Sequence, residues 1–417
     1  MPGQRESASS KRIFIWNSMG SLVYALSSFL MLIIVVRFCG SDEGGVFSIG
    51  YAIAQLMLTV GVFEATTYFA TDAQNRFSHA QYLAFKLSTC ALMIVVSVVY
   101  ITSFGYDAHK TLVAYALVAY RLFEALAQFW FAAFQKQERL DLGGFSTTWR
   151  SVLSMAVFAG ALFATGNLVG SLLAATAVEA VWIACYDIPR LHKLVKIGRP
   201  DFSLRPLAAL FLACLPLFIG SFLSTYLGNV CKYAIDSVGT YEMQTIYNIL
   251  FMPSFVINLF VNFFIRPSLT HLADLWLHRR VGEFMKVVAK LLAVVGGITV
   301  GVCAVCALVG IPILEAFYGV DLQGCLPALL ILLVGGGFLS ASNVFYNAMV
   351  IIRAQNGVLV GYGIAIVIAT VISTPIVAGW GILGASVAYA LSCTGLLAAF
   401  AAVFAFCARA QMRAWRK

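Results

Sequence analysis

The sequence predicts an all-α polytopic membrane protein with about 12 transmembrane helices in two six-helix lobes. The first observation is composition: 61% of the 417 residues are hydrophobic, 11% are charged, and the mean hydropathy is +0.90. Soluble domains are about 45–50% apolar and about 25% charged. The second observation is a series of apolar runs that are long enough to cross a bilayer, which takes ~20 residues. The third is a basic loop that divides these runs into six and six.

Each apolar run is expected to be a helix, because an open chain in lipid has to satisfy its backbone hydrogen bonds within itself. The first run exceeds the 7–15 residues of a signal peptide's apolar region, so we expect it to remain as an uncleaved span. The short sequence "ATGN" at Ala164–Asn167 forms the turn between the fifth and sixth spans. The expected spans are Ile13–Val36, Val46–Ala70, Tyr82–Thr102, Leu112–Phe134, Ser146–Ala164, Leu168–Tyr186, Pro206–Val230, Tyr241–Ile265, Phe284–Leu308, Cys325–Ile352, Leu359–Val377 and Ile382–Phe406.

The basic residues predict the orientation of the spans. If the N-terminus is inside, most of the 27 Lys and Arg residues lie in inner loops, and the outer turns contain Arg37, Lys110 and Lys232. This distribution follows the positive-inside rule and predicts that both termini are cytoplasmic. Topology therefore accounts for the net charge of +9, and because the basic residues are dispersed over short loops we expect no nucleic-acid partner.

The same short loops leave no room for a soluble catalytic domain. The sequence contains no G-x-x-x-x-G-K-[ST] phosphate-binding motif and no Ser/His/Asp or metal-ligand set at a recognisable spacing. The ten cysteines are scattered singly, except for Cys303 and Cys306, which lie inside an apolar run without a second pair. We therefore expect no enzymatic activity, no catalytic residue, no bound metal and no cofactor.

A similar turn occurs near the start of each half of the chain. The stretches "VVRFCGSDEGGVFSIG" (Val35–Gly50) and "VCKYAIDSVGTYEMQTI" (Val230–Ile246) each place a cation, Arg37 or Lys232, before a turn that contains Asp and Gly. An even number of spans in each half gives both halves the same orientation, which is typical of a parallel repeat. We predict an N-terminal lobe over residues 1–190, a basic cytoplasmic linker over 191–205 and a C-terminal lobe over 206–417.

Three stretches resemble the polysaccharide (O-antigen/capsule/exopolysaccharide) flippases of the multidrug/oligosaccharidyl-lipid/polysaccharide exporter superfamily. They are the hairpin "VRFCGSDEGGVFSIGYAIAQLMLTVGVF", the junction "PILEAFYGVDLQGCLPALLILLVGGGFLSASNVFYNAMV", and "AGWGILGASVAYALS" before the last hairpin. Together with the number of spans, the resemblance covers nearly the whole chain. The lipid II flippase branch usually has more spans, so the chain is more similar to the capsule, O-antigen or exopolysaccharide type.

The resemblance implies two lobes in a V around a central cavity and a transporter that works by alternating access. Its substrate would be an oligosaccharide on undecaprenyl pyrophosphate, flipped from the inner to the outer leaflet of the bacterial cytoplasmic membrane for surface polysaccharide assembly. The implied partners are this lipid-linked oligosaccharide, membrane lipids, and also a polysaccharide polymerase and glycosyltransferases. Without a nucleotide-binding motif, the expected energy sources are a H⁺ or Na⁺ gradient or downhill exchange.

The fourth span contains the clearest charged candidates for substrate binding and ion coupling. Arg121, Glu124 and Gln128 share one helix face, and a charge inside a membrane costs at least ~2.5 kcal/mol. Arg suits a diphosphate because its donors match phosphate oxygens. Two interpretations remain. In one, Arg121 contacts the substrate anion while Glu124 either tunes Arg121 or takes a coupling proton, and in the other the pair only joins helices. Glu64 is a second candidate for ion coupling, although a position near the membrane interface would also explain it.

Further candidates are two cations and a set of amides. Arg37 and Lys232 either face the cavity or extend to the lipid headgroups. Amide side chains at helical spacing would bind sugar hydroxyls, or alternatively would form hydrogen bonds between helices. The amides are Gln244, Asn248, Asn258 and Asn262 in the eighth span, and Asn343 and Asn347 in the tenth.

Two other functions remain possible at this stage. A cation-coupled multidrug exporter of the same fold would favour unpaired acidic residues in its cavity, whereas here the charge deep in the spans is positive or balanced. A membrane glycosyltransferase or polymerase would need a large outer loop and paired carboxylates for acid–base chemistry. The outer turns of this chain are short, so we consider this alternative the weaker one.

Overall fold

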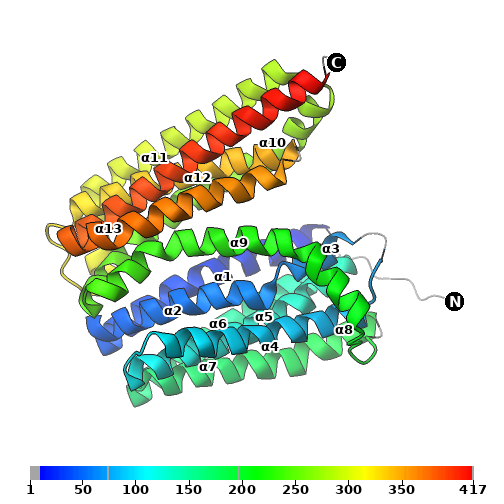
Figure 1. Ribbon diagram of the computed structural model, residues 1–417. Coiled ribbons are helices and arrows are strands. Elements are labelled where there is room, and N and C mark those ends of the chain that lie inside the picture. The colour runs from blue at the N-terminus through cyan, green and yellow to red at the C-terminus, as the bar shows by residue number, and fades with distance from the viewer. Residues whose placement is uncertain (1–9, 73–74, 196, 353, 416–417) are drawn as a thin grey trace. The chain divides into compact units, whose positions relative to one another are not determined.

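The computed structural model describes residues 10–72, 75–195, 197–352 and 354–415, and this part of the chain forms helices without any strand (Figure 1). The helices are α1 (Ser10–Cys39), α2 (Ser41–Val62), α3 (Ala65–Thr71), α4 (His79–Ser103), α5 (Ala108–Lys136), α6 (Leu140–Thr165), α7 (Leu168–Trp182), the π-helical turn η1 (Ile183–Asp187), α8 (Ile188–Leu194), α9 (Leu204–Val238), α10 (Tyr241–Leu277), α11 (Val281–Tyr318), α12 (Leu326–Ile351) and α13 (Gln355–Trp415).

The predicted class of fold, an all-α polytopic membrane protein, is confirmed. Among the described residues, 11 helical segments are long and apolar enough to cross a membrane. The last of them is α13, which contains the two predicted spans 359–377 and 382–406. Gly381 between them has φ 57° and ψ −131°, a conformation that favours glycine and interrupts the helix. At Gly384 a Cβ atom would lie 2.3 Å from the Ile376 carbonyl oxygen, so the bend also requires glycine at position 384.

By contacts, the chain divides into two compact units, Met1–Phe222 and Leu223–Lys417, with the boundary inside α9. In the first unit, α1 packs on α6, α2 packs on α4 and α5, and α7 packs on α5 and α6. The division into six-span lobes on either side of residues 191–205 stays a prediction, because these units are defined by contacts alone.

In the second unit, α12 lies between α10, α11 and α13. Three successive glycines in α12 make this possible, because a Cβ on each would meet a different neighbour. At Gly335 it would lie 2.7 Å from the Tyr389 ring, at Gly336 2.9 Å from Ser254 Cβ, and at Gly337 2.5 Å from Thr299 Oγ1. Small residues allow this close approach of helices in membranes. The triple glycine is therefore a packing element.

The second predicted span is broken near its C-terminal end. Phe63 and Glu64 both have positive φ values, 47° and 52°, and separate α2 from α3. The Lys86 ammonium donates to the carbonyl oxygens of Gly61 at 3.1 Å and Val62 at 3.2 Å, which α2 leaves unpaired where it ends. A buried lysine on α4 thus stabilises the broken end of α2.

Just after α3, Asp72 fixes the connection to α4. The carboxylate accepts hydrogen bonds from the Arg76 N–H at 3.1 Å and the Tyr82 hydroxyl at 3.0 Å. Burial alone would raise the pKa of this carboxyl, but these bonds, a further one from the Phe77 N–H and the positive charge of Lys136 lower the pKa below its ordinary value. The Asp72 side chain is therefore held as a carboxylate.

The seventh span differs from its prediction at its C-terminal end. Lys232 was expected to end this span at the turn, but α9 continues to Val238. The lysine therefore lies inside a helix and is buried, with 8% of its surface exposed. Arg37, its counterpart in the first half, lies in the last turn of α1 and is exposed. The two turns are thus similar in sequence, but their two cations lie in different environments.

Candidate functional site

The polar residues inside the spans form separate groups in the two units. The first unit contains a network of buried ion pairs on α5, α6 and α7, with tyrosines from α1 and α2. The second contains one buried lysine and two sets of amides on α10 and α12. Each group is described by itself.

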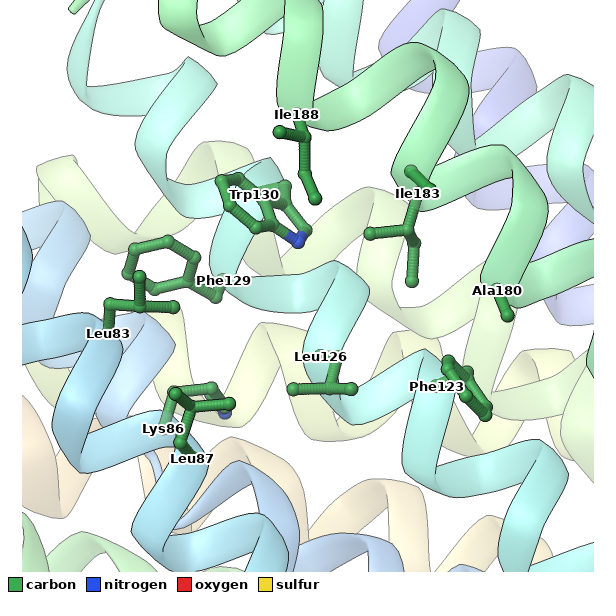
Figure 2. A pocket seen from close by; sticks show the side chains of 11 residues that line it. Leu83, Lys86, Leu87, Phe123, Leu126, Phe129, Trp130, Ala180, Ile183 and Ile188 are labelled. Atoms are coloured by element: carbon green, nitrogen blue, oxygen red, sulfur yellow. The ribbon is translucent and has the colours of Figure 1, made fainter. Parts of the chain in front are cut away.

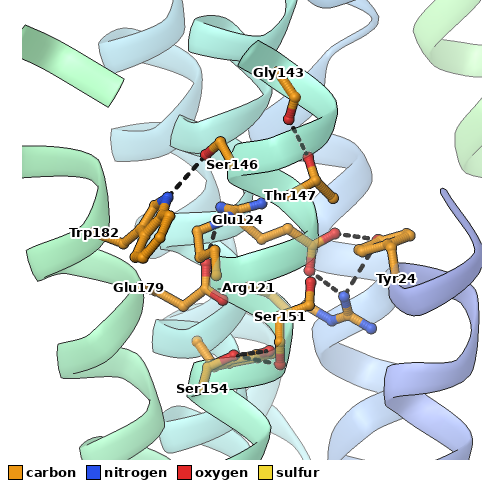
Figure 3. Close-up of polar contacts among 12 residues, drawn as sticks. Tyr24, Arg121, Glu124, Gly143, Ser146, Thr147, Ser151, Ser154, Glu179 and Trp182 are labelled. Carbon is orange, nitrogen blue, oxygen red and sulfur yellow. Dashed lines mark hydrogen bonds and ion pairs between the residues drawn. The ribbon is translucent and has the colours of Figure 1, made fainter. Parts of the chain in front are cut away.

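Arg121 and Glu124 form a buried ion pair on α5, with exposed fractions of 3% and 4%. Glu124 also accepts a hydrogen bond from the Tyr24 hydroxyl (Figure 3). Arg121 donates to the Tyr51 hydroxyl. The guanidinium carbon lies 4.3 Å from the centre of the Tyr51 ring, in a cation–π contact. The predicted pair on one helix face is therefore present, and it joins α5 to α1 and α2.

These contacts limit what Arg121 is free to do in this structure. Its two terminal nitrogens are engaged by Glu124 and by the hydroxyls of Tyr24 and Tyr51, and only its Nε has no hydrogen-bond partner among the described residues. Contact of Arg121 with a substrate anion would require exchange of at least one of these partners. Gln128, on the same face, is half-buried. Binding of substrate by Arg121 and Gln128 stays a prediction.

A second buried pair joins α6 to α7. Arg150 Nη1 lies 2.9 Å from Glu179 Oε2, and both side chains are almost completely buried. Asp187, at the end of η1, lies within electrostatic range of both and is 2% exposed. Sequence analysis missed Arg150 and Asp187 because they lie near the ends of their spans, where the positive-inside rule and interfacial solvation already explain a charge. The sequence did contain one sign of this group: Glu179 and Asp187 are two acidic residues, eight positions apart, on one apolar run.

The other predicted ion-coupling residue, Glu64, is separate from this network. Its carboxylate accepts a hydrogen bond from the Thr67 hydroxyl at 2.7 Å, one turn away at the break between α2 and α3. A role for Glu64 in ion coupling stays a prediction.

An apolar cavity of about 230 Å³ lies nearby in the first unit. Figure 2 shows side chains from α4, α5 and the α7–η1–α8 segment around it, including Leu83, Leu126, Trp130 and Ile183. Lys86 also lines it, but its ammonium is bound to the carbonyls that end α2. The lining is suited to a hydrocarbon chain, and it contains no set of polar groups for a sugar.

In the second unit, Lys232 is the buried cation. Its ammonium lies 5.1 Å from the centre of the Phe251 ring, and within the described part of the chain no carboxylate lies within ion-pair distance. Gln244, Asn248 and Phe251 follow one another on the same face of α10, so Lys232 packs on the face that bears these two amides.

The Gln244 amide is buried and has spare hydrogen-bonding capacity. The residue is 2% exposed, and neither its Oε1 nor its Nε2 has a hydrogen-bond partner among the described residues. Asn248 donates through Nδ2 to the Gln244 backbone oxygen at 3.0 Å, which leaves its Oδ1 as an acceptor. A buried amide without partners costs about 1–3 kcal/mol. A cation and two amides with such capacity are suited to an anion that also accepts hydrogen bonds.

The remaining predicted amides come together in a second set. Asn262 on α10 and Asn343 on α12 both donate to Asn258 Oδ1, each at 3.2 Å. Asn347 donates to the Asn343 backbone oxygen at 2.7 Å. All four are half-buried. The structure thus unites the amides of the eighth and tenth predicted spans, and their hydrogen bonds join α10 to α12.

Comparison with known proteins agrees with the fold and with the sequence resemblance. No family model matches the chain. The chain is 22% identical over 387 residues to the capsular polysaccharide biosynthesis protein CapF of Staphylococcus aureus, covering 91% of this chain and 95% of that protein.

Two solved structures share the fold at low sequence identity. The MATE transporter VcmN of Vibrio cholerae in its bent form has a TM-score of 0.59 and 14% identity, covering 96% of this chain and 97% of that chain. The lipid II flippase MurJ in an inward closed conformation has a TM-score of 0.69 and 11% identity, covering 91% of this chain and 86% of that chain. The neighbours are transporters and flippases, as expected of a chain for which the sequence predicts no enzymatic activity.

Proposed function

We propose that this chain, a multi-pass member of the multidrug/oligosaccharidyl-lipid/polysaccharide exporter superfamily, flips an undecaprenyl-pyrophosphate-linked oligosaccharide between membrane leaflets. The direction is from the inner to the outer leaflet of the bacterial cytoplasmic membrane, by alternating access, for surface polysaccharide assembly. The polymerase and glycosyltransferases of that assembly would be its partners. Both termini would be cytoplasmic, as the basic loops predict.

The observation that supports this proposal most strongly is the unneutralised charge of Lys232. An ammonium inside the membrane costs at least ~2.5 kcal/mol, so a buried one is a functional hypothesis by default. Because no carboxylate of the described chain pairs with Lys232, its counter-ion has to come from outside these residues. A diphosphate would supply that charge, and it would also accept a hydrogen bond from the Gln244 Nε2.

The amide set on α10 and α12 suits the sugar part of such a substrate. Asn258 uses its Oδ1 twice as an acceptor, so its Nδ2 is available as a donor. Half-buried amides in an otherwise apolar helix bundle offer both donors and acceptors to hydroxyl groups. The similarity to CapF, a protein named for capsular polysaccharide biosynthesis, supports the same class of substrate.

A binding experiment tests the role of Lys232. The purified protein in detergent is titrated with undecaprenyl pyrophosphate and with undecaprenol, which lacks the charge, and binding is followed by native mass spectrometry. We expect the wild type to prefer the pyrophosphate by on the order of tenfold, because a charge-assisted hydrogen bond contributes about 1.5–3 kcal/mol. Lys232→Gln should abolish this preference.

Lys290→Gln is the matched control, because Lys290 is an exposed lysine of the same unit. It should retain the wild-type preference for the pyrophosphate. An undiminished preference in Lys232→Gln would remove this lysine from the site. Transport of lipophilic cationic dyes by the wild type would instead favour a multidrug exporter, whose cationic substrates the positive charge of Lys232 would repel.

A further inference from the structure

The buried charges of the α5–α7 network do not balance. Two guanidinium groups, Arg121 and Arg150, face three carboxyl groups, Glu124, Glu179 and Asp187, and all five residues are at least nine-tenths buried. Each arginine already has a carboxylate at ion-pair distance, Glu124 for Arg121 and Glu179 for Arg150. Asp187 is the carboxyl group left over. A buried carboxylate without its own cation is costly, and burial favours the neutral, protonated form.

The immediate surroundings of Asp187 are polar on one side. Its Oδ1 has no hydrogen-bond partner among the described residues, and neither does Arg150 Nε. Both residues line a cavity of about 10 Å³ together with Ser146 and Thr147, which is near the smallest space that holds one water molecule. The Asp187 carboxyl group therefore borders a space where a water molecule can approach it.

The groups that face Asp187 are few. From α6 they are Arg150 and the Ser146 hydroxyl, which accepts a hydrogen bond from Trp182 Nε1 at 3.0 Å and so has its own proton free for the carboxyl. From α7 the titratable group that faces Asp187 is Glu179, and within η1 it is the neighbouring Tyr186. The α5 side chains on this side, Ala127, Phe131 and Phe134, carry no charge. Among the described residues that face Asp187, Arg150 is the cation that stabilises a carboxylate there, and the Ser146 hydroxyl is the neutral donor.

The backbone explains how Asp187 reaches this position. Residues 183–187 form a single π-helical turn between α7 and α8. A π turn inserts an extra residue and changes the direction of the side chains that follow it, and such turns often occur at functional sites. Asp187 is the last residue of this turn, at the end of the sixth span that the basic loops assign to the cytoplasm.

We infer that Asp187 is a proton-binding site that exchanges with water and competes with Glu179 for Arg150. In the arrangement described here, Asp187 holds a proton while Arg150 pairs with Glu179. When the O–H bond of the carboxyl breaks, the proton leaves to water and the new carboxylate attracts Arg150, which loosens the α6–α7 ion pair. Use of this step to couple transport to a proton gradient rests on the proposed function, whereas proton binding itself does not.

Infrared spectroscopy on the full-length protein in membranes tests the protonation directly. A protonated carboxyl group gives a C=O stretching band that a carboxylate lacks and that shifts in D₂O. We expect this band at mildly acidic pH in the wild type and its loss in Asp187→Asn. Glu179→Gln frees Arg150 to pair with Asp187, so in this variant the band should disappear at a lower pH than in the wild type. Asp274→Asn is the matched control, because it removes an exposed aspartate, and it should leave the band as in the wild type.

Two results would overturn the inference. One is an unchanged band in Asp187→Asn, and the other is a band in Glu179→Gln that disappears at the same pH as in the wild type or at a higher one. If Asp187→Asn does not fold, Asp187→Glu answers the same question, since a longer carboxylic acid at this site should shift the band, and an unshifted band would contradict the inference. Because no substrate is added, these outcomes are independent of whether the chain flips a lipid-linked oligosaccharide.

Discussion

Arg121 and Lys232 are both cations buried inside apolar helices, but they differ in what surrounds them. Arg121 has Glu124 one turn away and two tyrosine hydroxyls. Lys232 has an aromatic ring and an amide-bearing helix face. A paired charge mainly links helices, whereas an unpaired one attracts an anion. This contrast favours a role of Arg121 in the stability of the first unit, and it supports the proposed role of Lys232 in substrate binding.

The stability role of Arg121 predicts a specific pattern in a double-mutant cycle. Arg121→Met alone leaves Glu124 as an unpaired buried charge, so the protein should lose about 3–5 kcal/mol of unfolding free energy. Arg121→Met with Glu124→Leu removes both charges and should recover most of that loss. Thermal unfolding of the detergent-purified variants measures these changes in stability. A double variant whose loss equals the sum of the losses in Arg121→Met and in Glu124→Leu would show that the two charges act independently.

The candidate residues themselves could largely be found from the sequence, but their partners could not. Arg121 and Glu124 are three residues apart on one helix, so the helical period predicts their contact. Asn258 and Asn343 are on different spans, and no local rule predicts that their amides meet. Arg150 and Asp187 were missed for a related reason: their charges look interfacial in sequence, and only the packing of α6 against η1 buries them.

At the scale of the helices, positions follow from hydrophobic runs, whereas breaks depend on distant side chains. Twelve runs predict the spans, and in the structure Gly381 marks the bend within α13. The break at Phe63 and Glu64 has neither glycine nor proline at its centre. It is stabilised by Lys86 from α4, a contact that the sequence of α2 does not contain.

The packing role of the α12 glycines predicts opposite effects for one substitution at two sites. Gly→Ala in a helix normally stabilises it by about 1 kcal/mol. At Gly336 the new methyl group would lie 2.9 Å from Ser254 Cβ, so overpacking should reverse the effect and cost about 1–3 kcal/mol.

Gly301 on α11 is the matched control, because a Cβ there would meet nothing within 4 Å. Gly301→Ala should leave the thermal unfolding midpoint of the protein unchanged or raise it, while Gly336→Ala should lower it. Equal midpoints for the two variants would mean that α12 adjusts freely and that its glycines do not determine the packing of the second unit.

At the scale of the whole chain, the two units contain different chemistry. The α5–α7 network of the first unit has paired charges with one carboxyl group in excess, which suits proton binding. The second has a cation without a carboxylate and two sets of amides, which suits an anionic, hydroxyl-rich substrate. Buried charges and amides are both predicted from the sequence, but the two turns with Arg37 and Lys232 look equivalent at that level. In the structure only Lys232 is buried.

The most direct test of this account is a flipping assay in proteoliposomes with a fluorescent oligosaccharide on undecaprenyl pyrophosphate. A membrane-impermeant quencher reports how much of the label has reached the outer leaflet. We expect the wild type and Lys290→Gln to flip the lipid and Lys232→Gln to do so on the order of tenfold more slowly, as loss of one charge-assisted contact implies. Equal flipping rates for Lys232→Gln and the wild type would contradict the central claim that this buried lysine binds the diphosphate.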